Sequence, residues 1–170
     1  ASDVYKRQVK ECALSHGIEV FQPVKIRETA NIEYLRKFNA DIIIVVAFGQ
    51  ILSKSILDMP RYGCINVHAS LLPKYRGAAP IQWAVINGDE FTGVTTMRMD
   101  EGVDTGDMIA KSTVRLAPDE TGGSLFDKLS AEGAKLCVET MKMIEDGTAE
   151  YTPQNSEEAT HTSMISKELG

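Results

Sequence analysis

Apolar residues along the chain follow two different periods. They recur every three or four positions at residues 8–16, 80–86 and 122–146, as in helices with one buried face. They form short runs or alternate at residues 18–21, 42–46, 63–68, 92–99 and 108–116, as in strands. Two shorter helices are predicted to begin near Thr29 and after Ser53. Because strands and helices follow one another, we predict an α/β fold with a doubly wound, mostly parallel, Rossmann-like sheet.

The strands differ in their patterns. Residues 42–46 are all β-branched and apolar, which predicts a strand that is buried on both faces. Residues 92–99 instead alternate: Val94, Thr96 and Arg98 are expected on one face of a strand, and Thr95, Met97 and Met99 on the other. Thr121 is the expected cap of the longest helix, which Gly147 ends. From Tyr151 onward the chain is polar, and we expect an irregular, exposed tail.

Composition excludes several classes of protein. Of the 170 residues, 43% are hydrophobic. The chain has 18 Lys and Arg residues and 24 Asp and Glu residues, which give a net charge of −6. This balance excludes an acidic disordered tail and a strongly basic nucleic-acid module. The longest apolar run, residues 42–48, is far shorter than the ~20 residues that span a bilayer. No signal peptide is recognisable, and three scattered cysteines are typical of reduced thiols, so we expect a cytoplasmic protein without a membrane span.

The triplet Asn66-Val67-His68 is the most informative candidate for chemistry. Residues i and i+2 of a strand point the same way, so Asn66 and His68 share a face at the carboxyl end of a predicted strand. Ligands of such sheets bind beyond these strand ends. An Asn amide can donate to a developing oxyanion, and His can transfer a proton near neutral pH. The missing carboxylate could come from the loop at residues 100–107, whose spacing does not choose among Asp100, Glu101, Asp104 and Asp107.

Simpler interpretations exist for each of these residues. A His at a strand end is more often structural, an Asn there often forms a turn, and an acidic loop is often only solvated. The loop lacks the spacing of a calcium site, and we expect no metal. Ser70 next to His68 allows a serine hydrolase, but no G-x-S-x-G motif surrounds it. Neither G-x-G-x-x-G nor the phosphate-binding G-x-x-x-x-G-K-[ST] occurs.

The loop after the triplet suits a flat organic ligand. Leu71 and Leu72 are apolar although they lie in a loop, and Pro73 stiffens it. Lys74 and Arg76 follow, and either could hold an anionic group or serve only solubility.

Two stretches resemble the folate-dependent formyltransferases. One is NVHASLLPKYRGAAPIQW at residues 66–83, and the other is TGVT at residues 92–95 with MDEGVDTGD at residues 99–107. Residues 76–82 and 97–108 are most similar to the members of this family that act on methionyl-tRNA. The resemblance extends from about residue 9 to residue 168.

The resemblance implies a site and a reaction. Asn66, His68 and Asp104 correspond to the family's catalytic residues. The implied donor is 10-formyltetrahydrofolate, the implied acceptor is the amino group of initiator methionyl-tRNA, and no metal is required. The pterin ring of the folate is expected against the following residues: Phe48, Gly49, Gln50, Ile51, Leu52, Ser70, Leu71, Leu72 and Pro73.

Parts of the family pattern are missing from the chain. The sheet of the family has a strand order similar to 3-2-1-4-5-6-7. Strands 1 and 2 would lie in the sheet between the strands at residues 18–21 and residues 42–46, and neither is recognisable in this chain. Residues 1–8 match nothing in the family and are interpreted as foreign to it. We therefore expect residues 9–165 to be a partial catalytic domain, and residues 166–170 to start a linker to an absent tRNA-binding domain. For this chain alone we expect a monomer with weak or no turnover.

Other functions remain open at this point. The motifs define the formyl donor better than the acceptor, so an amino sugar, a nucleotide amine or water could replace methionyl-tRNA. A catalytically inactive, folate-binding fragment is a second alternative, and the serine hydrolase is a third.

Overall fold

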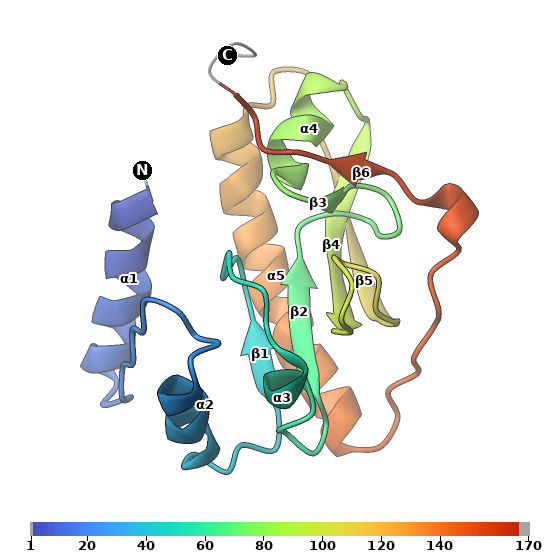
Figure 1. Cartoon of the computed structure of the whole chain (residues 1–170). Helices are drawn as coiled ribbons and strands as arrows, with labels where there is room; N and C mark the ends of the chain where they lie inside the picture. Colours follow the sequence, from blue (N-terminus) through green and yellow to red (C-terminus); the bar gives the residue numbers. More distant parts are fainter. Residues whose placement is uncertain (1, 167–170) are drawn as a thin grey trace.

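The computed structural model describes residues 2–166, with helices on both sides of one sheet (Figure 1). Its helices are α1 (Ser2–Ser15), α2 (Thr29–Arg36), α3 (Lys54–Leu57), α4 (Pro80–Ile86), α5 (Gly122–Glu145) and the 3-10 helix η1 (Ser156–Glu158). Its strands are β1 (Ile43–Val45), β2 (Cys64–His68), β3 (Arg76–Gly77), β4 (Phe91–Arg98), β5 (Met108–Arg115) and β6 (His161–Thr162). The predicted α/β class is therefore confirmed.

Four strands form the main sheet in the order β1-β2-β4-β5. β1 and β2 pair in parallel, as predicted, with Ile43 opposite Cys64. The pairs β2–β4 and β4–β5 are antiparallel, so the sheet as a whole is mixed. The short loop at residues 99–107 accounts for the β4–β5 pair, because it turns the chain back from β4 into β5 as a hairpin does.

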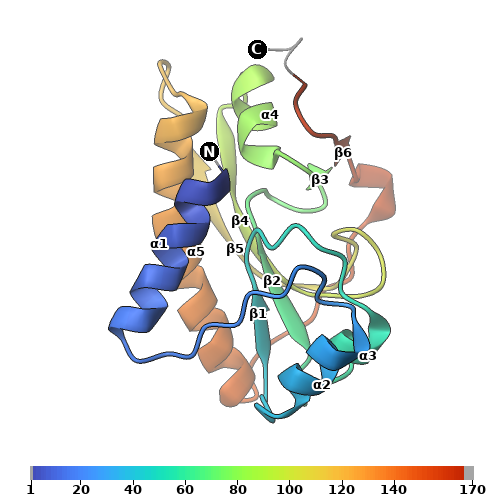
Figure 2. The ribbon, with the colours of Figure 1, turned by 60° about the vertical axis from the view of Figure 1, so that its left-hand side comes forward.

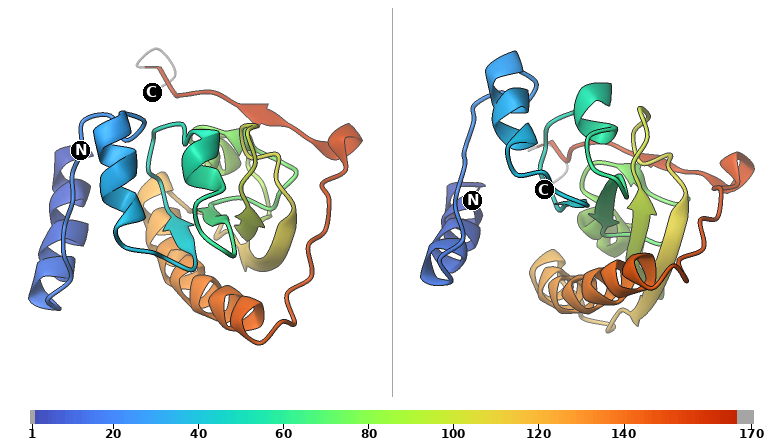
Figure 3. Two further views of the ribbon diagram at one scale, coloured as in Figure 1. Left: turned by 60° about the horizontal axis from the view of Figure 1, so that its bottom comes forward. Right: turned by 90° about the horizontal axis from the view of Figure 1, so that it is seen from below.

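Helices cover the two faces of the sheet, with α5 on one side and α2 and α3 on the other (Figure 3). Thr121 caps α5 as predicted, because its side chain accepts a hydrogen bond from the backbone of Ser124. Gly133 of α5 lies against Val67 and Val94, where a Cβ would already be 3.3 Å from Val67. Val67 therefore points toward α5, and its neighbours on β2 point to the opposite face.

The amino-terminal segment differs from the prediction. Residues 18–21 form no strand, and β1 pairs with no described strand on its outer side. α1 lies on this open side of β1 (Figures 1 and 2). Val46 at the end of β1 is 61% exposed, so the run at residues 42–46 is only partly buried, because nothing described covers its edge. The predicted strand at residues 18–21 is wrong, because these residues pair with no described strand.

The expected irregular tail is partly wrong as well. β6 pairs in parallel with β3, so residues after Tyr151 return across the upper part of the molecule, beside α4 (Figure 1). Before this pairing, Thr152 and Met108 exchange two backbone hydrogen bonds. Of the expected linker at residues 166–170, residues 167–170 lie outside the described residues.

Candidate active site

The face of β2 that lies away from α5 carries the predicted pair. Asn66 and His68 point to this face, as their spacing predicts, and β4 places Met97 opposite Asn66 and Thr95 opposite His68. Met97 and Thr95 are 1% and 0% exposed, so packed side chains flank the pair on this face. Packed neighbours restrict the rotamers of the two polar side chains.

The loop between β4 and β5 brings one carboxylate to this pair. Asp100 is used inside the loop, because its carboxylate accepts from Gly102 N at 3.0 Å and from Thr105 Oγ1 at 2.6 Å. Glu101 and Asp107 are exposed. Asp104 alone among the four acids contacts Asn66 and His68, which is the carboxylate that the family resemblance implied.

The three predicted catalytic side chains are within mutual reach. Asn66 Nδ2 donates to Asp104 Oδ1 at 3.3 Å, and His68 Nδ1 lies 3.6 Å from Asp104 Oδ2. The side chains of His68 and Asp104 are only 8% and 14% exposed. Their interaction is thus shielded from water on most sides, which strengthens electrostatic effects. The geometric prediction that these three residues converge is confirmed.

A backbone carbonyl orients the imidazole. His68 Nε2 lies 2.8 Å from Tyr75 O, and a carbonyl oxygen can only accept, so Nε2 carries a proton. The other ring nitrogen, Nδ1, faces the Asp104 carboxylate. Both ring nitrogens are therefore directed at oxygen atoms, one at a backbone carbonyl and the other at a carboxylate.

Three further groups complete the surroundings of Asp104. Gly77 N donates to Asp104 Oδ2 at 2.8 Å, and Gln154 Nε2 donates to Asp104 O at 2.8 Å. Arg76 Nε in turn donates to Gln154 Oε1 at 2.9 Å. The sequence interpretation missed Tyr75, Gly77 and Gln154. Two of them act through backbone atoms, which residue type does not reveal, and Gln154 lies in the segment expected to be irregular.

The first predicted folate-binding segment follows β1. Phe48 and Ile51 are 42% and 78% exposed, whereas Leu52 is buried. Gln50 Oε1 accepts from Ile26 N at 2.9 Å, which ties the segment to the α2 side of the molecule. Gly49 has a φ of +72°, in the left-handed region that favours glycine. Within the described chain, the backbone N–H and C=O groups of residues 48–51 make no hydrogen bond, so they are free to pair with a ligand.

The second predicted folate-binding segment, Ser70 to Pro73, is tightly built. Ser70 and Leu72 are fully buried, and Pro73 is buried too. Ser70 Oγ donates to Lys74 O at 2.7 Å, and Leu71 packs against Gly93. Ser70 is thus hydrogen-bonded away from His68, which argues against the serine hydrolase. The buried side chains fix the shape of this loop, and its contact with a ligand stays a prediction.

Among residues 2–166, no group of three or more His, Cys, Asp or Glu side chains could hold a metal ion. None of the described helices is both long and apolar enough to cross a bilayer.

Comparison with known proteins places the chain in a family. The family model described as formyl transferase matches residues 3–141. The methionyl-tRNA formyltransferase of Lachnospira eligens is 59% identical over 162 residues, which are 95% of this chain and 51% of the relative. That of Clostridioides difficile is 55% identical over 162 residues, 95% of this chain and 52% of the relative. The chain therefore spans about half the length of these relatives.

Solved structures with the same fold include enzymes that are named for formyl transfer. The formyltransferase PseJ from Anoxybacillus kamchatkensis, solved with tetrahydrofolate and a formylated UDP-sugar, has a TM-score of 0.71 at 25% identity, covering 92% of this chain and 80% of PseJ. Glycinamide ribonucleotide transformylase 1 from Symbiobacterium toebii has a TM-score of 0.74 at 20% identity, covering 85% of this chain and 74% of that enzyme. The family match, which includes the converging Asn66, His68 and Asp104, shows that the chain belongs to the formyl transferase family.

Proposed function

We propose that the chain carries the catalytic site of an enzyme that transfers a formyl group from 10-formyltetrahydrofolate to the amino group of methionyl-tRNA. The contact of the Asp104 carboxylate with both Asn66 and His68 carries this proposal, because it assembles an amide donor, an imidazole and a base in one place. The acceptor is chosen from the relatives, which are methionyl-tRNA formyltransferases at 59% and 55% identity. The formyltransferase solved with a UDP-sugar is only 25% identical.

The segment after β1 fits a folate. Val46, Phe48 and Ile51 expose apolar side chains beside the sheet edge from which β2 presents the catalytic residues. The unpaired backbone groups of residues 48–51 suit a pterin, whose edge is rich in donors and acceptors. We propose that residues 48–52, with Ser70 to Pro73, hold the donor, which supplies an activated formyl group when it is bound.

Each catalytic side chain has a role that its position supports. Asp104 accepts a proton from the attacking amine, which forms the new C–N bond to the formyl carbon. Asn66 Nδ2 donates to the formyl oxygen as negative charge develops there, and such a donor contributes about 3–4 kcal/mol in comparable sites. His68, held by Tyr75 O, supplies positive charge beside that oxygen. The amine's proton is then available for the folate nitrogen as the old C–N bond breaks.

The proposal also covers the domain bounds, the location, the partner and the oligomeric state of the chain. Residues 9–165 would form the catalytic domain of an enzyme that works in the cytoplasm, where translation begins. Initiator methionyl-tRNA would be its macromolecular partner, and the chain would be a monomer.

A single-turnover assay with the chain in excess over substrate tests the proposal. Formyl transfer from 10-formyltetrahydrofolate is followed with methionyl-tRNA, with a UDP-linked amino sugar, and with no acceptor. We expect formyl-methionyl-tRNA as the product, formed slowly, in line with the weak turnover expected for this chain alone, and still faster than either alternative. Faster formylation of the sugar or faster release of formate would instead identify another acceptor or water.

Calorimetry separates binding from chemistry in the same system. A folate analogue should bind wild type and Asn66→Ala with similar affinity, because Asn66 acts on the formyl oxygen and not on the pterin. Transfer by Asn66→Ala should fall about 10²–10³-fold. Intact transfer by Asn66→Ala would contradict the role given to this residue.

A further inference from the structure

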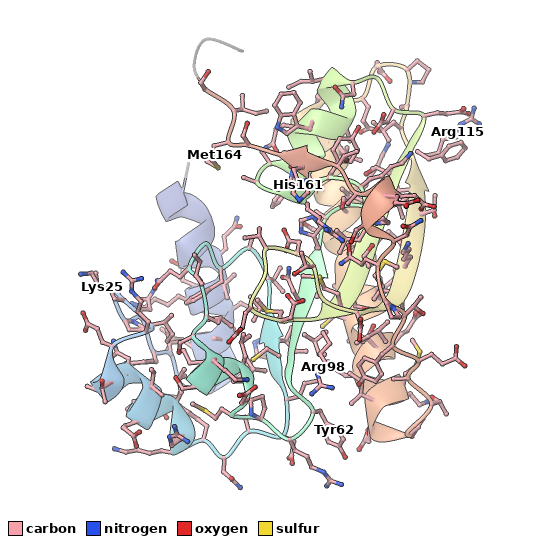
Figure 4. The ribbon with its side chains drawn as sticks, turned by 45° about the vertical axis from the view of Figure 1, so that its right-hand side comes forward. Lys25, Tyr62, Arg98, Arg115, His161 and Met164 are labelled. Carbon is pink, nitrogen blue, oxygen red and sulfur yellow. The ribbon has the colours of Figure 1, made fainter. Side chains whose placement is uncertain are left out.

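The segment after α5 runs back across the catalytic face. Its two-residue strand β6 pairs with β3, directly after the loop that supplies Tyr75 O to His68. Figure 4 shows His161 on this crossing segment, which passes over the upper part of the molecule before it reaches Met164. The segment therefore lies beside two elements of the site, the loop before β3 and the loop that carries Asp104.

Gln154 makes the most direct contacts between this segment and the site. Its Nε2 donates to two carbonyl oxygens of the acidic loop, Asp104 O and Gly106 O, each at 2.8 Å. Its Oε1 accepts from Nε of Arg76, whose side chain is buried. Both ends of one amide are thus used, one on the acidic loop and the other on β3.

The acidic loop needs such support. Asp104 has a φ of +55°, a left-handed conformation that glycine adopts readily and aspartate only occasionally. Gly106 is pressed against the chain, since a Cβ there would be 1.7 Å from Arg98 O. A backbone in this state persists only when its surroundings determine it, and the two carbonyls held by Gln154 are on both sides of Thr105 in this turn.

We propose that Gln154 is a positioning residue for Asp104: its two hydrogen bonds to the loop hold the carboxylate toward His68 and Gly77. The inference rests on the proposed function, because it names a further part of the same site. It makes the segment after α5 a component of the active site, although that segment contributes no side chain to the reacting atoms.

One amide reports the position of the Asp104 carboxylate. Gly77 N donates to Asp104 Oδ2, whereas its neighbours Arg76 N and Ala78 N donate to the carbonyls of Thr160 and Thr162 in the returning segment. The exchange rate of the Gly77 amide therefore reports whether the Asp104 carboxylate is in place. The exchange rates of the Arg76 and Ala78 amides report whether the returning segment is still paired. The three amides distinguish a misplaced carboxylate from a detached segment.

The variant Gln154→Glu tests the proposal with little change in size. It retains an acceptor for Arg76 and removes the donor that holds Asp104 O and Gly106 O. The neighbouring Asn155→Asp is the matched control, because it makes the same amide-to-acid change and its Oδ1 can still accept from Glu157 N. Among the described residues, Asn155 forms no hydrogen bond with the acidic loop, and its amide donates to Glu158.

We expect exchange at Gly77 to accelerate about 10- to 100-fold in Gln154→Glu, with Arg76 and Ala78 unchanged and with all three unchanged in Asn155→Asp. Equal acceleration at all three amides, or at none, would overturn the proposal. In the single-turnover assay, Gln154→Glu should lower the transfer rate at saturating folate with little effect on the folate concentration that gives half of that rate, and Gln154→Ala should do the same. If wild type transfers no formyl group, the proposed function fails, while the exchange experiment still decides whether Gln154 positions Asp104.

Discussion

Thr95 of β4 ties down the loop that is expected to bind folate. Its hydroxyl is fully buried, accepts from Leu72 N at 3.1 Å and donates to Ser70 O at 2.7 Å. Thr95→Val keeps the shape of the side chain and removes both hydrogen bonds. One N–H and one C=O group of the loop then lose this partner inside the protein, at a cost of about 1–3 kcal/mol each.

Thr92 on the same strand is the matched control. It is 2% exposed, and its hydroxyl has no hydrogen-bond partner among the described residues. Thr92→Val removes the same group and gives the same gain in strand propensity, but it leaves no partner unpaired. Because a buried hydroxyl without a partner is unfavourable, we expect Thr92→Val to stabilise the fold by about 1 kcal/mol.

Thermal unfolding measures the difference. Allowing for partial relaxation, Thr95→Val should lose about 3 kcal/mol, and for a chain of this size each kcal/mol changes Tm by roughly 2–4 °C. We expect Tm to fall by about 6–12 °C for Thr95→Val and to rise by about 2–4 °C for Thr92→Val. Equal shifts in the same direction would refute the assignment of the Thr95 hydroxyl as the anchor of this loop.

Two further predictions concern pH and packing. The pKa of Glu120 is lowered from 4.5 to about 2, chiefly by a hydrogen bond from the backbone N–H of Ala117. Hydrogen bonds from the side chains of Lys128 and Ser124 lower it further. Ionised Glu120 therefore stabilises the fold above pH 4.5 and loses this effect as pH falls toward 2, so the Tm of wild type should exceed that of Glu120→Gln at pH 7 and converge with it near pH 2. At Gly93 a Cβ would be 2.0 Å from Ser112 O, so circular dichroism should show Gly93→Ala unfolded or strongly destabilised. Gly123→Ala near the start of α5 should be neutral or stabilising, since the nearest atom to a Cβ there is 3.9 Å away.

Local patterns were sufficient for the elements that depend on nearby residues. The alternation at residues 92–99 and the Thr121 cap predicted β4 and the start of α5, and the spacing of Asn66 and His68 placed both on one face. The same alternation is typical of antiparallel strands, and it could have corrected the prediction of a mostly parallel sheet in this region.

Long-range contacts account for what the sequence did not predict. Spacing could not select Asp104 from four acids, because its φ of +55° and the internal contacts of Asp100 decide which carboxylate turns inward. The strand β6 has two residues, and its pairing with β3 depends on a partner about 85 positions earlier in the sequence. Gln154 was missed for the same reason, since no periodicity marks a side chain that bonds to backbone carbonyls of a distant loop.

The most direct test of the account is the single-turnover rate of formyl transfer by Asp104→Asn at saturating folate. The substitution keeps the size of the side chain and removes the base that contacts Asn66 and His68. We predict a rate that is about 10²–10⁴-fold lower than wild type, with folate affinity nearly unchanged. Asp107→Asn, an exposed acid of the same loop, should retain the wild-type rate. A normal rate for Asp104→Asn, or an equal loss in both variants, would contradict the claim that Asn66, His68 and Asp104 act together on one formyl group.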